Sequence, residues 1–194
     1  VFKDTDGDGI SDYDEIYLYK TDPEKARTKG EGKTDGEKIK EGIDPLSDVE
    51  ERVQYQDPRE DKESFVSESY KLEKIALLKE QKALAFEGSA LPNTYVTLYI
   101  YSTPVVVTVK TDDQGKWSYQ LDKELEDGEH QMYVASVDNS GKIVARSNPI
   151  LFTKSAEAAT IGIAGSIDNS VHTQDFLKDN FIRIEDKDYL IHRI

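Results

Sequence analysis

Hydrophobic and polar residues alternate most regularly over residues 95–101, "YVTLYIY". Val96, Leu98 and Ile100 fall on one side of this run and Thr and Tyr on the other, which is the period of a β-strand. Similar short runs stand at 104–110, 116–121, 130–137 and 142–152, with "KIALLK" and "ALAF" upstream. Two loops of the form D-x-x-G-K separate strands as hairpin loops do. About seven short strands over roughly 85 residues predict a mainly β fold, an antiparallel β-sandwich at residues 69–154.

The same alternation predicts the core of the sandwich. Val96, Leu98 and Ile100 are expected to face inward together with Trp117, which is typical of a core or sheet-face anchor. Val134 joins this set, although its run "MYVASV" is apolar on both faces and leaves the register open.

The opposite face of the alternating strand carries a row of tyrosines, Tyr95, Tyr99 and Tyr101. Two interpretations follow from this row. The rings form either a platform on which sugars stack or a cross-strand ladder that shields the second face of the sheet.

Residues 1–48 have a different character, because they are rich in Asp, Glu, Lys and Gly and contain an internal repeat. The motif D-x-D-x-D-G at 4–9 aligns with R-x-K-x-E-G at 27–32, twenty-three residues further on. "TDP" at 21–23 aligns with "IDP" at 43–45 after a one-residue gap. Each unit therefore predicts a loop, a short helix and a stop at Asp-Pro.

The first loop, "DTDGDGISDYDE", matches the calcium-loop pattern D-x-[DN]-x-[DN]-G-x5-E at every specified position. A loop of this length can wrap several oxygen ligands around one Ca²⁺ ion. Gly9 stands at the sharp turn, and the Ile10 side chain is left for packing. The predicted metal ligands are Asp4, Asp6, Asp8, the backbone carbonyl of Ile10, Asp12 (directly or through water) and Glu15 (with both oxygens). The alternative is a solvated acidic loop.

The second loop departs from this pattern, because Arg27, Lys29 and Lys38 occupy the first, third and last ligand positions. Only Glu31 and Asp35 remain as acids, so we expect no strong calcium binding there. One interpretation places a Lys or Arg side chain where the ion would sit, paired with these two acids. The other is a decayed, solvated loop. Candidates for additional ligands across the repeat are Asp22, Glu37 and Asp44.

Two resemblances to known families follow from these residues. The phrases "DTDGDGISDYDE" and "YKTDP" resemble bacterial thrombospondin type-3-like repeats, and more distantly dockerin repeats. Residues 70–153 resemble the immunoglobulin-like domains of bacterial surface proteins, through the spacing Gly88…Pro92…Val96 and a D-x-x-G-K loop before Trp117. The resemblances imply an immunoglobulin-like β-sandwich preceded by a small loop-helix calcium-binding (EF-hand-like) unit, in an extracellular protein of the bacterial surface.

Composition narrows the classes of function. The 194 residues carry 39 acids and 25 bases, a net charge of −14, and no cysteine. Such a chain repels phosphate and favours cations, so we expect no nucleic-acid partner. No apolar run approaches the ~20 residues that span a bilayer. The three histidines are scattered and no catalytic motif stands out, so we expect no enzyme.

Two segments flank the sandwich. Residues 49–68 are charged and predict a linker, with a short helix at Val49–Gln54. Residues 155–194 predict a spacer and a strand-like tail containing "FIRI" and "YLIHRI". An open strand edge invites pairing, so the tail is expected either to fold back on its own sandwich or to exchange with a neighbouring copy.

The sequence therefore predicts a calcium-stabilised extracellular structural or adhesive module of a bacterial cell-surface or filament protein. Its expected partners are the calcium ion and either further copies of itself or neighbouring surface-protein domains. The alternative is an accessory carbohydrate-binding module of an exported enzyme. An exposed aromatic groove on the sandwich would favour that alternative.

Overall fold

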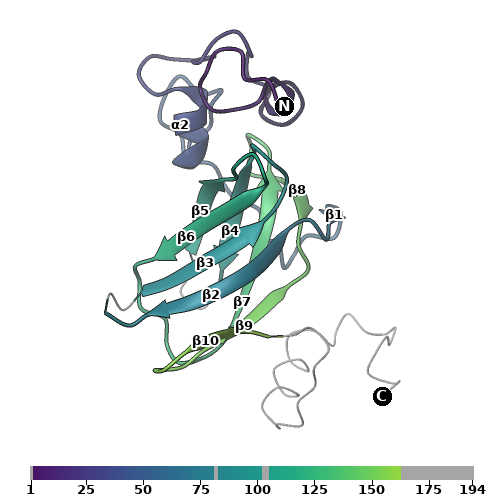
Figure 1. The fold of residues 1–194 in the computed structure, drawn as a ribbon. Helices are drawn as coiled ribbons and strands as arrows, with labels where there is room; N and C mark the ends of the chain where they lie inside the picture. The colour runs from purple at the N-terminus through teal and green to yellow at the C-terminus, as the bar shows by residue number, and fades with distance from the viewer. Residues whose placement is uncertain (1, 81–82, 102–104, 163–194) are drawn as a thin grey trace. The chain divides into compact units, whose positions relative to one another are not determined.

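The computed structural model describes residues 2–80, 83–101 and 105–162. Short helical turns near the N-terminus precede two β-sheets (Figure 1). In chain order the elements are α1 (Asp12–Asp14), the π-helical turn η1 (Glu15–Tyr19), α2 (Asp35–Lys40), β1 (Phe65–Val66), β2 (Lys71–Leu78), β3 (Ala83–Ser89), β4 (Tyr95–Ile100), β5 (Val105–Lys110), β6 (Lys116–Leu121), β7 (Gly128–Val137), β8 (Ile143–Arg146), β9 (Ile150–Lys154) and β10 (Ala159–Ile161).

The strands form one seven-stranded and one three-stranded sheet over the described residues. The larger sheet has the order β1-β8-β7-β4-β5, and the smaller one has the order β2-β3-β6. Strand β7 is long enough to pair with two partners in turn, β9 along its first half and β8 along its second. Only β1 and β8 pair in parallel among these strands. The predicted mainly β antiparallel sandwich is confirmed.

The core between the two sheets contains the residues predicted for it. Val96, Leu98, Ile100 and Trp117 are all buried, and Val134, opposite Leu98, has no exposed surface, which settles its register. Trp117 lies opposite a glycine of β3 in the strand pairing. A Cβ at that glycine, Gly88, would lie 2.2 Å from the indole ring, so the missing side chain makes room for the tryptophan.

The outer face of the larger sheet is covered as well. Tyr99 of β4 is buried together with Tyr133 of β7, and Tyr55 packs edge-on against Tyr99 with ring centroids 6.3 Å apart. Tyr95 is also buried, in a cluster formed with the N-terminal repeats. The guanidinium of Arg59 lies 3.9 Å from the ring centroid of Tyr101. The tyrosine row is therefore a shielded ladder and not an exposed stacking platform.

Residues 49–68 are bonded to the sandwich. Asp61 accepts a hydrogen bond from Arg146 Nε at 2.9 Å, Gln56 N donates to the Gly141 carbonyl at 3.0 Å, and β1 pairs with β8. The helix predicted at Val49–Gln54 is wrong. Backbone bonds from this stretch to the end of the second repeat hold it in a non-helical conformation instead.

The first residues after the sandwich include a further strand. β10 pairs antiparallel with β9, so part of the segment predicted as a spacer belongs to the larger sheet. Three residues are too few for their pattern to reveal a strand. The strand-like stretches "FIRI" and "YLIHRI" lie outside the described residues.

Candidate calcium site

The two N-terminal loops have the same backbone conformation although their side chains differ. Gly9 has φ +95° and its equivalent Gly32 has φ +96°, while Gly7 and Gly30 have φ +76° and +75°. These angles lie in the left-handed region that favours glycine. The sequence repeat is therefore a structural repeat, and the glycine expected at the sharp turn is required in both copies.

Each loop is closed by the same side-chain bond. Thr5 N donates to Asp12 Oδ1 at 2.7 Å in the first loop, and Thr28 N donates to Asp35 Oδ2 at 2.8 Å in the second. A Ser or Thr side chain then caps the helix that follows each loop. Since these bonds recur at the same offset, the two loops share the closing bond and the helix cap.

The one-residue gap between the repeats has a structural counterpart in η1. The first repeat holds one residue more than the second between its last ligand position and the Asp-Pro stop. A π-helical turn contains one more residue than an α-helical turn, so η1 accommodates the insertion. Thr21, just after this turn, donates its hydroxyl to Glu15 Oε1 at 3.0 Å.

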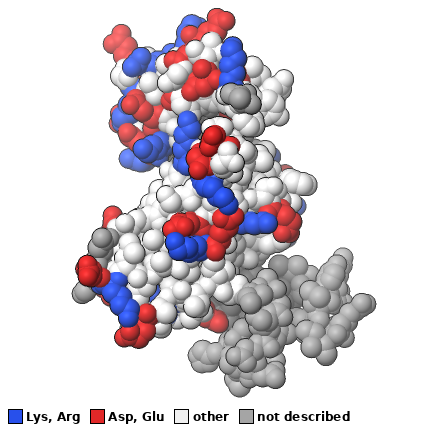
Figure 2. All heavy atoms as spheres, viewed as in Figure 1, with Lys and Arg blue, Asp and Glu red and all other residues white. Residues whose placement is uncertain are grey.

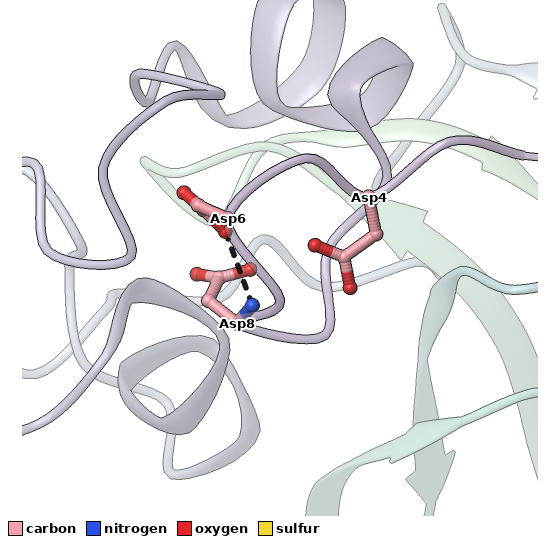
Figure 3. Close-up of side chains that lie close together, drawn as sticks. All are labelled: Asp4, Asp6 and Asp8. Carbon is pink, nitrogen blue, oxygen red and sulfur yellow. Dashed lines mark hydrogen bonds between the residues drawn. The ribbon is translucent and has the colours of Figure 1, made fainter.

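The acidic side chains gather in two groups of three that share Asp8. Asp4, Asp6 and Asp8 form the first group and extend from one turn of the loop (Figure 3), where Asp8 N donates to Asp6 Oδ1 at 3.1 Å. Asp8, Glu15 and Asp35 form the second. Within each group the oxygens lie within 4.8 Å of one another. Because Asp35 belongs to α2, both repeats contribute to the second group.

Some of these oxygens are buried without a hydrogen-bond partner in the described protein, namely Asp6 Oδ2, Glu15 Oε2 and Asp35 Oδ1. Glu15 and Asp35 are 0% exposed. An ionised carboxylate that is buried and unpaired is strongly unfavourable, and a bound cation removes that cost. Hard, anionic oxygen donors of this kind suit Ca²⁺ or Mg²⁺ better than a softer metal. The residues present therefore fit a calcium ion.

The pKa values of these carboxylates without a bound cation also favour a cation site. Burial raises the pKa of Glu15 to about 7, although the bond from Thr21 opposes the rise. Burial likewise raises the pKa of Asp8 to about 6, and it also raises the pKa values of Asp6 and Asp35. Neighbouring carboxylates add to the rise at Glu15, Asp8 and Asp6. A bound cation favours the ionised forms, so its binding would release protons near neutral pH.

The predicted ligands differ in their surroundings. Asp4, Asp6, Asp8 and Glu15 lie in the two groups. Ile10 buries its side chain as predicted, and the role of its carbonyl stays a prediction. Asp12 lies outside both groups among the described residues. Its oxygens accept bonds from the hydroxyl and N–H of Thr5, which lower its pKa.

Asp35 is the acid of the second group that the predicted ligand set does not contain. The cross-repeat candidates from sequence were Asp22, Glu37 and Asp44, and none of them lies in either group within the described chain. The sequence contains one feature that indicates a role for Asp35. It is an acid at a ligand position in a loop where most of the acids are replaced by bases.

In the second loop, Lys38 occupies the position that Glu15 occupies in the first. Lys38 is 6% exposed, and its Nζ donates to the carbonyls of Lys29 at 2.7 Å, Ser47 at 3.1 Å and Pro45 at 3.3 Å. A lysine therefore does enter the loop, as one interpretation proposed. Its bonds go to main-chain carbonyls, however, and not to Glu31 and Asp35. Arg27, Lys29 and Glu31 are exposed, as the solvated-loop interpretation expects, so that interpretation fails only at the buried Lys38.

Comparisons with known proteins agree with these loops and sheets. Residues 4–26 match the sequence model of the bacterial TSP3 repeat, and residues 78–153 match that of the bacterial Ig-like domain. The chain combines a TSP3 repeat with an Ig-like domain. No curated protein and no solved structure gave a match. TSP3 repeats bind calcium, and both families are typical of structural, non-enzymatic modules at the bacterial surface.

Charged side chains of both signs are interspersed over the two N-terminal repeats (Figure 2). On the visible face, red and blue atoms alternate over the N-terminal part, whereas the Ig-like domain shows broad uncharged areas (Figure 2). None of the described helices has the length and apolar character needed to cross a membrane.

Proposed function

We propose that this chain is a calcium-stabilised structural module of an extracellular bacterial surface protein. The observation that carries the proposal is the pair of buried, unpartnered carboxylate oxygens in the TSP3 repeat, Asp6 Oδ2 and Glu15 Oε2. A protein folds around such atoms at a high cost unless a cation is present. The calcium would supply the positive charge that the loop lacks.

The chain's own residues would hold the ion in complementary ways. Asp4, Asp6, Asp8 and Glu15 would be its carboxylate ligands, and Ile10 would add a backbone carbonyl. Asp12, engaged by Thr5, would shape the loop from outside the carboxylate groups or reach the ion through water.

Calcium titration tests the proposal. Extracellular calcium modules bind at about 10⁻⁴–10⁻³ M, and free calcium at about ten times Kd should stabilise the unit by roughly 1.4 kcal/mol. Glu15→Gln should weaken binding about tenfold or more in isothermal titration calorimetry, because it removes a buried ligand charge. Glu24→Gln, at an exposed acid of the same repeat, should leave the affinity unchanged. Absence of any binding by the wild-type chain would refute the proposal.

A structural role fits the described residues better than carbohydrate binding by the sandwich. A groove of about 880 Å³ lies between β5 and β6, but its two aromatic residues, Tyr95 and Trp117, are buried at 7% and 3% exposure. Sugar stacking needs an exposed ring face. The alternative of an accessory carbohydrate-binding module therefore has little support from this groove.

Self-association by strand exchange is the assembly mode that we include in the proposal. Strand β5 ends the order of the larger sheet, and the groove beside it leaves room for an added strand. The donor would be the C-terminal tail. Analytical ultracentrifugation of the full chain and of a chain ending at Gly162 tests this, because residues 1–162 form one compact unit. We expect assembly of the full chain only. Equal behaviour of the two chains would contradict exchange.

A further inference from the structure

Asp35 has the properties of a metal ligand although it belongs to the second repeat. Its carboxylate shares a group with Asp8 and Glu15 of the TSP3 repeat. It has no exposed surface, and its Oδ1 is buried with no hydrogen-bond partner in the described protein. The bond that Oδ2 accepts from Thr28 N, at 2.8 Å, fixes the position of the carboxylate.

We infer that Asp35 is a ligand of the calcium bound by the TSP3 repeat, so that the ion joins the two repeats. The inference rests on the proposed function, because it requires calcium at the first loop. Two bases of the second loop direct their hydrogen bonds to other groups, although both lie near enough to lower the pKa of Asp35. Lys38 donates to three main-chain carbonyls, and Arg27 Nε donates to the Gly32 carbonyl at 2.6 Å. Neither base donates to Asp35 Oδ1, which is left for a cation from outside the chain.

The packing around Asp35 brings the two repeats into direct contact. Gly36 N donates to Asp8 Oδ2 at 3.0 Å. A Cβ at Gly36 would lie only 2.4 Å from the backbone oxygen of Asp8, so only glycine lets α2 approach the first loop this closely. The ligand position of Asp35 is thus built into the contact between the repeats.

The contact extends to the Ig-like domain. Ile39, one turn after Asp35 on α2, is buried in a cluster with Ile10 and Tyr19 of the TSP3 repeat and Tyr95 of β4. An ion that holds Asp35 would therefore also hold α2 against Tyr95. Calcium would order the junction with the sandwich as well as the first loop.

Calorimetric titration of the full chain with CaCl₂ tests the assignment. Asp35→Asn should weaken calcium binding at least about tenfold, equivalent to about 1.4 kcal/mol. Asparagine keeps an acceptor for Thr28 N and removes the charge. Glu31→Gln is the matched control, because it makes the same change of charge at an exposed acid of the same loop, and it should bind as the wild type does. Hydrogen exchange should show calcium protecting residues 35–40 in the wild type and not in Asp35→Asn.

Thermal unfolding in EDTA separates a ligand from a merely structural residue. Without calcium, Asp35→Asn should be at least as stable as the wild type, because one charge is removed from a repulsive cluster. Only with calcium should it be less stable. Wild-type affinity in Asp35→Asn would overturn the inference and leave the proposed function intact. Equal destabilisation with and without calcium would also overturn it. No binding by the wild type would overturn both.

Discussion

Replacing Lys38 with methionine is expected to lower the free energy of unfolding of the second repeat by about 3 kcal/mol or more, with or without calcium. The buried ammonium donates three hydrogen bonds to the carbonyls of Lys29, Pro45 and Ser47. Each hydrogen bond to a charged group contributes roughly 1.5–3 kcal/mol, and methionine fills similar space without a donor. Three carbonyl oxygens would be left without this partner.

Hydrogen exchange across residues 29–47 and thermal unfolding measure this loss. Lys40→Met is the matched control, because Lys40 is an exposed lysine of the same helix, and its replacement should change stability by no more than about 0.5 kcal/mol. Calcium should not rescue Lys38→Met, since Arg27 and Lys29 occupy ligand positions of this loop. Rescue by calcium, or a loss no larger than in the control, would contradict the role assigned to Lys38.

The second large effect is expected at Asp61→Asn, which should cost about 3–5 kcal/mol because it leaves a largely buried guanidinium without its carboxylate. Asp61 is 5% exposed and accepts bonds from Arg146 Nε at 2.9 Å and from the Ser64 hydroxyl. Denaturant unfolding measures the loss. Glu73→Gln, at the exposed pair with Lys116, should cost no more than about 1 kcal/mol. A similarly small effect at Asp61 would show that this ion pair does not anchor residues 57–64.

The same residue gives a pH dependence with a definite sign. Burial opposes ionisation of Asp61, but the bonds from Ser64 and Arg146 outweigh it and lower the pKa to about 2. Because this folded-state pKa lies below the unfolded value of about 3.9, Asp61 stabilises the fold fully above about pH 5 and loses that effect toward pH 2. The wild type should lose roughly 2 kcal/mol more than Asp61→Asn between pH 6 and pH 2. Equal acid sensitivity would contradict the pKa assignment.

The sequence predicted the inner face of β4 well because its alternation is strict and its apolar residues are unambiguous. It could not show how the outer face is covered. Tyr55 and Arg59, which lie on that face, come from a charged segment without strand or helix periodicity. Strands β1 and β10 contain only two and three residues, which is too short for a period to be recognised.

The gathering of acids in the first loop was predictable because its expected ligands all lie within twelve consecutive residues. The place of Asp35 beside Asp8 was not predictable. It depends on a contact between segments that are distant in the sequence, such as the bond between Gly36 and Asp8, which are 28 residues apart. The role of Lys38 was predictable only in part. Its charge indicated a substitute for the ion, but its actual partners are main-chain carbonyls, which every residue carries and no side-chain pattern can distinguish.

The parallel pairing of β1 with β8 has a mechanical consequence. Residues 56–67 are bonded along residues 141–146, from Gln56 at one end to Ser67 at the other. Parallel strands begin at the same end. A pull on the chain before β1 and after β8 therefore slides one segment lengthwise along the other. The hydrogen bonds between the two segments are then loaded at the same time and do not break one after another. Tension applied across these two segments is therefore resisted in shear at the place where residues 49–68 join the sandwich.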